Sequence, residues 1–218
     1  MDEQNKESKR VILQKIRSAT KSDEYSHKDN ILRSRMKKNK STEIKYVSNL
    51  DVFISKLEQA KATVSVVSHK RDIITEVHKY VSQHQISSVI TVAQHTDFPS
   101  LDWEGVDTTT QYNPKALSTS VTFAVMGIEE TGALVMLSSP SSPTGMNFLP
   151  DHHFIVLDAD KVVKTMEDVW AQLSKSGEPL PRTINLITGP SRTADIEYEI
   201  QIGAHGPKSL HVIIVKNH

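Results

Sequence analysis

Cysteine is absent from this chain of 218 residues. The chain can therefore form no disulfide, no thiolate zinc site and no iron–sulfur cluster held by its own cysteines. Net charge is missing too, because 26 lysines and arginines balance 26 aspartates and glutamates. That balance gives no overall attraction to nucleic acid or to an anionic membrane. No apolar run approaches the roughly 20 residues that a membrane-spanning helix needs, so no membrane span is expected.

The start of the chain does not look like a targeting segment. Residues 1–10 are polar and include acids, unlike a signal or transit peptide. We therefore expect a cytoplasmic protein. The length fits one domain with a small appendage, and the composition predicts an N-terminal amphipathic helix with a charged arm over residues 1–48, followed by an α/β domain over residues 49–218.

The appendage has two parts. Residues 8–19 place Val11, Ile12, Ile16 and Ala19 at helical spacing, which predicts an amphipathic helix that docks on the core, on a second copy or on a partner. Residues 20–45 are strongly polar and bury too little apolar surface to order themselves. We interpret them as a solvated charged arm.

The body alternates helix and strand patterns. Helices are predicted over residues 51–60 and 72–83, with strands over 63–67 and 87–93, which is the pattern of a βαβ unit with a parallel strand pair. Further strands are predicted over 121–127, 133–137, 154–157, 184–187 and 210–215, and a helix over 160–173 with Trp170 in the core. Six or seven strands in this order indicate a mixed, largely parallel sheet covered by helices.

Two stiff corners near the end of the chain are candidates for a site. Gly189-Pro190 follows one apolar run and Gly206-Pro207 precedes another, and Ser191 or Thr193 could cap a helical turn. Such corners would bring polar side chains to one rim, namely Ser191, Arg192, Thr193, Asp195 and His205. Ligands of open α/β sheets bind beyond the carboxyl ends of the strands. Arg192 or backbone N–H groups would hold a small carboxylate there, although two ordinary tight loops explain the pattern equally well.

A third corner carries adjacent acids. Ile128-Glu-Glu-Thr-Gly132 separates two apolar runs and is short enough for a hairpin. A carboxylate beside a glycine can serve as base, nucleophile or hydrogen-bond acceptor while the backbone approaches a substrate closely. The alternative is that Glu129 and Glu130 are simply exposed turn residues.

The loop 138–150 and the histidines after it complete the candidate features. The loop is rich in serine and proline, which indicates either a lid or plain surface. His152 and His153 precede an apolar strand, and neighbouring strand residues point to opposite faces. A metal pair is therefore disfavoured, while one of the two histidines could line the site.

Several segments resemble a known family. Thr188-Gly-Pro-Ser-Arg-Thr-Ala-Asp-Ile-Glu197 and Gly203-Ala-His-Gly-Pro-Lys-Ser-Leu-His211 closely resemble the C-terminal signature of the lactate utilization protein C family, part of the wider LUD-domain group. Gly127-Ile-Glu-Glu-Thr-Gly-Ala-Leu-Val135 resembles its central motif, and Leu149-Pro-Asp-His-His-Phe-Ile-Val156 the loop and strand that follow. The family usually has a basic residue in the preceding loop, where this chain has Thr144-Gly-Met-Asn147.

The resemblance implies a fold and a role. The fold would be like that of the NagB, ribose-5-phosphate isomerase and CoA-transferase group. The role would be that of a component of an L-lactate dehydrogenase (oxidoreductase) complex, which oxidises lactate to pyruvate with two partner proteins, the A and B components, that carry iron–sulfur clusters. No cofactor is assigned to this chain itself, because it lacks cysteine and shows no nucleotide fingerprint or metal spacing.

Pattern and resemblance together select the candidate residues. The candidate catalytic residues are Glu130, Asp195 and His205, the last because histidine suits proton transfer. The candidate substrate-binding residues are Thr131, Gly132, Gly189, Ser191, Arg192, Thr193 and Gly206. Two other roles stay open: a stand-alone enzyme of the CoA-transferase or formyltetrahydrofolate cyclo-ligase kind, and a non-catalytic scaffold in which these motifs only shape turns.

Overall fold

The computed structural model describes residues 10–11, 14–15, 48–86, 89–95, 103, 105–196, 199–202 and 205–216. Contacts divide the chain into two units, Met1–Lys45 and Tyr46–His218. In the first unit the four described residues are helical and exposed, which are Arg10, Val11, Gln14 and Lys15. The rest of the predicted helix over 8–19 and the polar stretch 20–45 lie outside the described residues.

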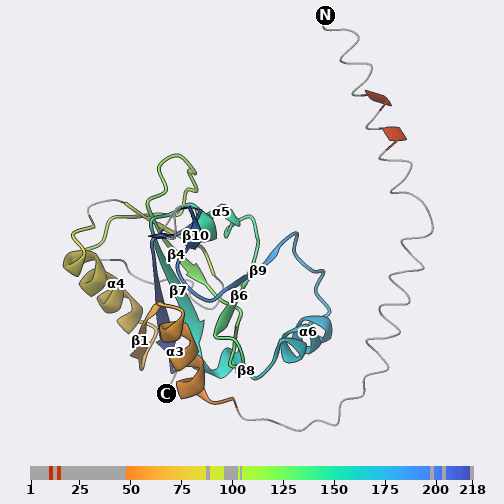
Figure 1. Cartoon of the computed structure of the whole chain (residues 1–218), viewed down its shortest axis with the longest axis horizontal. Helices are drawn as coiled ribbons and strands as arrows, with labels where there is room; N and C mark the ends of the chain where they lie inside the picture. Colours follow the sequence, from red (N-terminus) through yellow and green to blue (C-terminus); the bar gives the residue numbers. More distant parts are fainter. Residues whose placement is uncertain are drawn as a thin grey trace, which may run out of the picture. The chain divides into compact units, whose positions relative to one another are not determined.

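The second unit is built on a parallel sheet of six strands (Figure 1). Its strand order is β1-β12-β7-β4-β2-β3, and every neighbouring pair is parallel. The strands are β1 Thr63–Val67, β2 Ile90–Val92, β3 Thr108–Thr109, β4 Thr119–Phe123, β7 His152–Asp158 and β12 Ser209–Val215. The predicted fold class, mixed α/β with a largely parallel sheet, is therefore confirmed.

The predicted βαβ unit needs a correction. Helix α4 (Asp72–Gln83) does connect β1 to β2, and the two strands are parallel members of one sheet. They are not neighbours, because β12, β7 and β4 lie between them. Burial explains the order, since β7 and β12 are buried along almost their whole length while β1 is buried only at its last residue. The most apolar strands occupy the centre, where both faces are covered.

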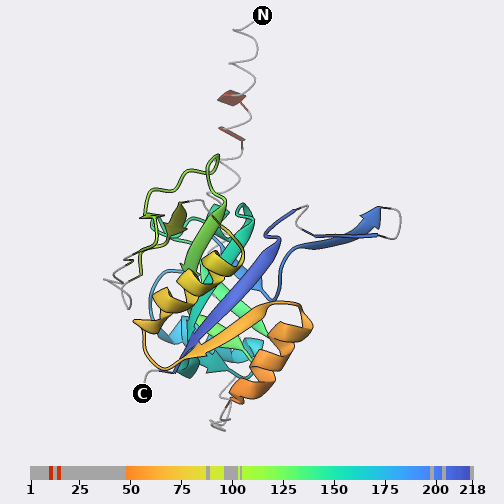
Figure 2. The same ribbon diagram turned by 90° about the vertical axis from the view of Figure 1, so that its left-hand side faces the viewer.

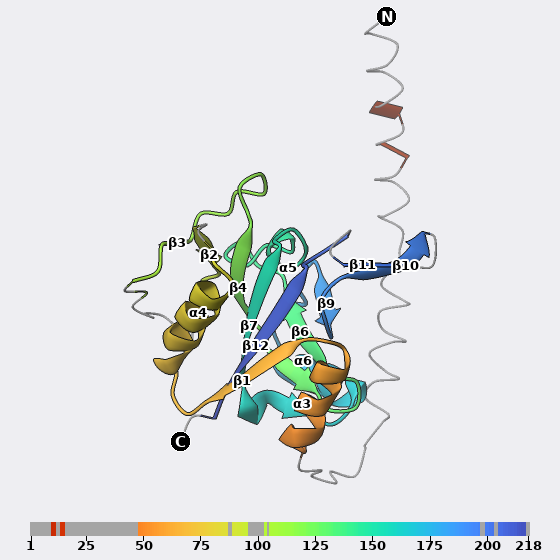
Figure 3. The ribbon, with the colours of Figure 1, turned by 60° about the vertical axis from the view of Figure 1, so that its left-hand side comes forward.

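Strand alternation divides the core between the two faces of this sheet. Phe154 and Val156 of β7 belong to a cluster with the buried side chains of α4, whereas Ile155 and Leu157 belong to a cluster on the opposite face. Helix α3 (Leu50–Gln59) covers that opposite face through Phe53 and Leu57. Figure 3 shows α4 and α3 on either side of the central strands.

A second sheet of four strands shares the α3 side. Its order is β8-β5-β6-β9, and its strands are β5 Met126–Ile128, β6 Ala133–Leu137, β8 Val162–Val163 and β9 Ile184–Ile187. The single strand predicted over 121–127 was wrong, because β4 and β5 belong to different sheets. Ala124 lies between them and packs in the core between the sheets. The hairpin predicted around Glu129 is confirmed, since β5 and β6 pair antiparallel.

The helix predicted over 160–173 was also wrong in its first half. A 3-10 turn η1 (Ala159–Lys161) leads into β8, and α6 (Met166–Lys175) begins only after Thr165. The β-branched Val162 and Val163 pair with β5, while Thr165 and Asp168 form a capping box that fixes the start of α6. Trp170, predicted to be core, is 39% exposed.

The segment after β9 is not the predicted helical turn. It forms β10 (Arg192–Ile196), which pairs antiparallel with β11 (Glu199–Ile202) in a two-stranded ribbon. Figure 2 shows this ribbon leaving the body of the domain. The Ser191 N–H donates to the carbonyl oxygen of Pro207 over 2.8 Å, which draws the two segments together as the base of a ribbon rather than the start of a helix.

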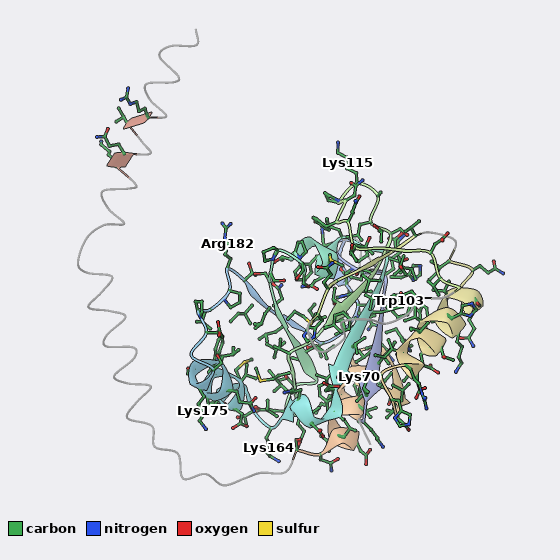
Figure 4. All side chains as sticks on the ribbon, turned by 180° about the vertical axis from the view of Figure 1, so that it is seen from behind. Lys70, Trp103, Lys115, Lys164, Lys175 and Arg182 are labelled. Carbon is green, nitrogen blue, oxygen red and sulfur yellow. The ribbon has the colours of Figure 1, made fainter. Side chains whose placement is uncertain are left out.

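The remaining parts are short. Helix α5 (Gly145–Phe148) lies in the predicted serine- and proline-rich loop. Trp103 is half-buried, packs against the core cluster of α4 and lies beside that helix in Figure 4. The described residues form twelve strands, more than the six or seven predicted, because several strands are only two or three residues long. Within the described part of the chain, no helix has both the length and the apolar character to cross a membrane.

Candidate functional site

A cavity of approximately 220 Å³ lies where the two sheets and α5 meet. Its walls come from the start of β7 and β12, the end of β9, helix α5 and the two corners that carry Gly189 and Gly206. The lining residues are Asn147, Phe148, His153, Leu186, Ile187, Thr188, Gly189, Ser191, His205, Gly206, Pro207 and Leu210. Segments far apart in the sequence therefore supply one small site.

The two corners close against each other. In addition to the hydrogen bond from Ser191 N–H to Pro207, a Cβ atom placed on Gly206 would lie 3.1 Å from Cβ of Ser191. That separation is tighter than an ordinary carbon–carbon contact of about 3.5–4.0 Å. Glycine at position 206 therefore lets the chain entering β12 pass close beside the chain leaving β9.

Helix α5 covers another side of the cavity. The Ser120 hydroxyl of β4 donates to the carbonyl oxygen of Met146 over 2.7 Å, and Met146 itself is buried in the core. This anchor holds the next residue, Asn147, at 3% exposure, while Phe148 after it is 41% exposed. The cavity thus has a polar amide inside and an exposed aromatic ring at its mouth.

His153 lies on the same sheet face as Ile155 and is 1% exposed. Its Nε2 atom is hydrogen-bonded to the Thr122 hydroxyl over 2.7 Å. Burial lowers the pKa of His153 to about 3, so the ring is neutral near pH 7. His152 points to the other face, where Nδ1 is hydrogen-bonded to the Ser209 hydroxyl over 2.8 Å. The alternation predicted for these two histidines is confirmed, and His153 is the one that lines the cavity.

Two buried polar atoms of the cavity residues have no partner. They are Oδ1 of Asn147 and Nδ1 of His153. A buried polar atom without a hydrogen bond costs about 1–3 kcal/mol of stability. Native structures keep few such atoms, and a ligand or water that supplies the missing bond is a common reason. Both atoms are buried and belong to residues that line the cavity, so a ligand or water that reached them would supply a missing hydrogen bond.

Four of the sequence-predicted residues meet here, and they are Gly189, Ser191, His205 and Gly206. Their place in the cavity agrees with the expectation that the two corners share one rim, while their part in binding stays a prediction. The rim differs from the expected one in its position. The cavity lies at the amino ends of β7 and β12, because the corner with Gly206 feeds the start of β12 rather than leaving its end.

Three other predicted residues lie on the ribbon. Arg192 is exposed and does not line the cavity. Thr193 pairs with Gln201 across the ribbon, and Asp195 lies on the same strand. The structure describes only the backbone of Thr193 and Asp195, so their predicted roles in binding and catalysis remain predictions.

The corner of Glu130, Thr131 and Gly132 lies outside the cavity lining. Glu130 and Thr131 are exposed, whereas Gly132 is buried with a φ of +70°. A Cβ on Gly132 would lie 2.6 Å from Cβ of Lys56, and one on Gly189 would meet the carbonyl oxygen of Ala60. Both glycines thus pack against α3 or its end, one helical turn apart. Close packing on α3 is sufficient to explain why glycine occupies both positions.

For Glu129, the alternative of an exposed turn residue was wrong. It is 7% exposed, and its Oε2 atom accepts a hydrogen bond from the backbone N–H of Asn49 over 2.5 Å. Its Oε1 atom lies 3.4 Å from Nζ of Lys164, a side chain labelled in Figure 4. Asn49 is the N-cap of α3, so Glu129 joins the β5–β6 turn to the start of that helix. A carboxylate is favourable at this position because of the helix dipole.

The sequence signals for the remaining cavity residues differ. Strand alternation limits the choice to one of the two adjacent histidines, but Asn147 stands in a loop with no periodic pattern that would single it out. Across the described residues, no group of three or more histidine, aspartate or glutamate side chains is arranged to hold a metal ion.

A model of the LUD domain family matches residues 50–215, which include both sheets and the cavity. The chain belongs to the LUD domain family. This LUD domain is 35% identical over 100 residues to Lactate utilization protein C of Halalkalibacterium halodurans, covering 44% of each chain. It is 32% identical over 100 residues to the protein of the same name in Bacillus subtilis, covering 44% of this chain and 42% of that relative.

Another relative and one solved structure are also similar to this chain. The LUD domain is 34% identical over 98 residues to the Escherichia coli protein YkgG, covering 43% of this chain and 42% of that one. The aligned part thus spans less than half of each of these three relatives. A crystal structure of a DUF162 family protein from Deinococcus radiodurans superposes with a TM-score of 0.54 at 20% identity, covering 76% of this chain and 95% of that one. The superposition shows a shared fold.

Proposed function

We propose that this chain is a component of an L-lactate utilization system, in which lactate is oxidised to pyruvate together with iron–sulfur partner proteins. The observation that carries the proposal is the kinship itself: relatives named Lactate utilization protein C align with this LUD domain at 31–35% identity over about 100 residues. The absence of cysteine supports the division of labour, because Cys-ligated clusters would have to come from partners.

The cavity is the part of this chain that we expect to contact a small molecule in that system. It combines the two glycine-bearing corners of the C-terminal signature, at Gly189 and Gly206, with polar side chains, and two of its lining residues have an unpartnered polar atom. The chain would then contribute binding, while the partners would carry the electrons. This division predicts that the purified chain alone does not oxidise lactate.

The proposal is tested by removing the gene from its host and comparing growth on L-lactate with growth on pyruvate. We expect growth to fail on lactate, to continue on pyruvate and to return when the gene is restored. Purification of the tagged protein from lactate-grown cells should also yield iron-containing partner proteins. Normal growth on lactate without the gene would refute the proposed role.

One observation favours a second candidate, a scaffold without a ligand. Gly132 and Gly189, both predicted to bind substrate, pack against α3, so these corners have a structural explanation. In the scaffold role, Glu130→Gln and Arg192→Ala would leave lactate oxidation intact. If either residue acts on a substrate, the same variants would lower lactate oxidation while the fold, measured by circular dichroism, stays unchanged. Loss of a charge-assisted bond at Arg192 would weaken binding about ten- to hundredfold.

A further inference from the structure

We propose that the cavity between the two sheets binds an uncharged small molecule that presents a primary amide, or an equivalent donor and acceptor pair, on an apolar body. The inference rests on the geometry of the cavity and does not require the lactate role. The proposed ligand is neutral, whereas the sequence led us to expect a carboxylate, because the side chains that line the cavity are not the ones expected.

No aspartate, glutamate, lysine or arginine is among the described residues that line the cavity. His153 is neutral near pH 7 because burial lowers its pKa to about 3. Lys208 and Asp151 near the starts of β12 and β7 pair with each other over 3.0 Å, and Arg192 is exposed outside the cavity. A charged group that leaves water without a paired charge pays a large desolvation cost, so the inner cavity favours a neutral ligand.

Oδ1 of Asn147 can only accept a hydrogen bond, and it is buried without a donor among the described residues. The terminal torsion of asparagine is soft, so the amide can turn either its oxygen or its nitrogen towards an occupant. A primary amide complements this group, because its N–H₂ donates to Oδ1 while its carbonyl accepts from Nδ2. Ser191 and His153 add further polar atoms around the same space.

Apart from its polar groups, the cavity is lined by the apolar side chains of Phe148, Leu186, Ile187, Pro207 and Leu210. Phe148 and Leu186 are 41% and 45% exposed, which places apolar surface where the cavity opens to solvent. With about 30 Å³ per water molecule, a cavity of approximately 220 Å³ has room for roughly seven waters. A small ring with an amide substituent fits that space.

Benzamide and benzoate test the inference directly. The two share a ring and differ in one group, which is a neutral amide in the first and a carboxylate in the second. Each is titrated into the full-length ¹⁵N-labelled protein at about pH 8, where exposed imidazoles are neutral. We expect benzamide to shift the backbone amide signals of cavity residues such as Ser191 and Gly206 in a saturable way. Benzoate should bind at least about tenfold more weakly, since its charge has no partner.

Two variants make the test specific to the cavity. Asn147→Leu removes the amide and should weaken benzamide binding at least about tenfold, because two hydrogen bonds to the ligand are lost. Asn185→Leu is the matched control, because Asn185 also has a buried unpartnered side-chain atom but does not line the cavity. Its benzamide affinity should stay within about twofold of the original.

Three results would overturn the inference. They are equal or tighter binding of benzoate, unchanged benzamide affinity in Asn147→Leu, and the absence of saturable benzamide shifts among cavity residues. The first and third need only the unmodified protein, so a variant that fails to fold does not weaken the test. None of them depends on growth on lactate, so this inference and the proposed function can fail separately.

Discussion

Acidification should destabilise this protein through two buried histidines, His153 and His211. They are 1% and 7% exposed, and burial lowers their pKa values from 6.5 to about 3 and about 4. For His211, Glu76 on α4 opposes the effect of burial, while His84 and Lys79 add to it. Its Nδ1 atom is hydrogen-bonded to the Thr63 hydroxyl over 2.7 Å.

The sign follows from which state binds protons. Below pH 6.5 the unfolded chain protonates both histidines, while the folded protein keeps them neutral until the pH reaches their lowered pKa values. The free energy of unfolding is therefore complete above about pH 6.5 and falls as the pH drops towards 4. Each proton contributes up to about 1.4 kcal/mol per pH unit, so the two together contribute up to about 2.7 kcal/mol per unit. Burial also lowers the pKa of the half-buried His152, which acts in the same direction.

The assay is urea unfolding followed by tryptophan fluorescence between about pH 7 and pH 5. His211→Asn keeps a polar atom near Thr63 but removes the titrating ring, so the slope should fall by about 1.4 kcal/mol per pH unit. His69→Asn is the matched control, because it makes the same substitution at an exposed histidine. A variant of His211 with the original slope would show that the fold does not hold this ring neutral, and the reasoning would be refuted.

Three further changes test the packing around the site. Gly132→Ala should lower the free energy of unfolding by about 2–4 kcal/mol, because of the left-handed backbone and the clash with α3. Gly177→Ala is the control, since Gly177 has the same φ of +70° but no atom nearby, and it should lower that free energy by only about 1 kcal/mol. Equal losses in chemical unfolding would contradict the role of Gly132 in packing. Glu129→Gln should cost about 1–2 kcal/mol because the start of α3 loses a charged acceptor, and a thermal melt like that of the original protein would argue against that role. Asn147→Leu should leave the free energy of unfolding the same or higher when no ligand is added, because an unpaired polar atom is removed. A clear loss of stability would show that Asn147 holds the fold together.

Local pattern was sufficient for the regular elements. Four predicted ranges coincide with the structure: β1 at Thr63–Val67, α4 at Asp72–Gln83, β6 at Ala133–Leu137 and β9 at Ile184–Ile187. Each of these has an apolar period, an apolar run or a high content of β-branched residues, and residues close in sequence decide such patterns. The corners at Gly189 and Gly206 could also be predicted from the sequence, because Gly-Pro interrupts a regular helix or strand.

Distant contacts decided the rest. The split between β4 and β5 depends on Ala124 packing between two sheets, and the ribbon after Ser191 depends on a bond to Pro207. The local sequence predicts one apolar strand in the first case and a helix cap in the second. The contacts that decide otherwise come from residues far away in the sequence. The family motifs identified the LUD domain, but they did not show that Gly132 serves packing on α3.

The sequence by itself therefore determined the fold class, most strands and helices, and two corners that meet at a cavity. Only the tertiary structure decided that Asn147 and His153 line that cavity and that Arg192 does not. It also showed that no aspartate, glutamate, lysine or arginine is among the described residues of the lining. The physical reason is that burial and hydrogen-bond satisfaction belong to the packed arrangement of several segments. The environment of a side chain is set only when the segments that pack around it are in place.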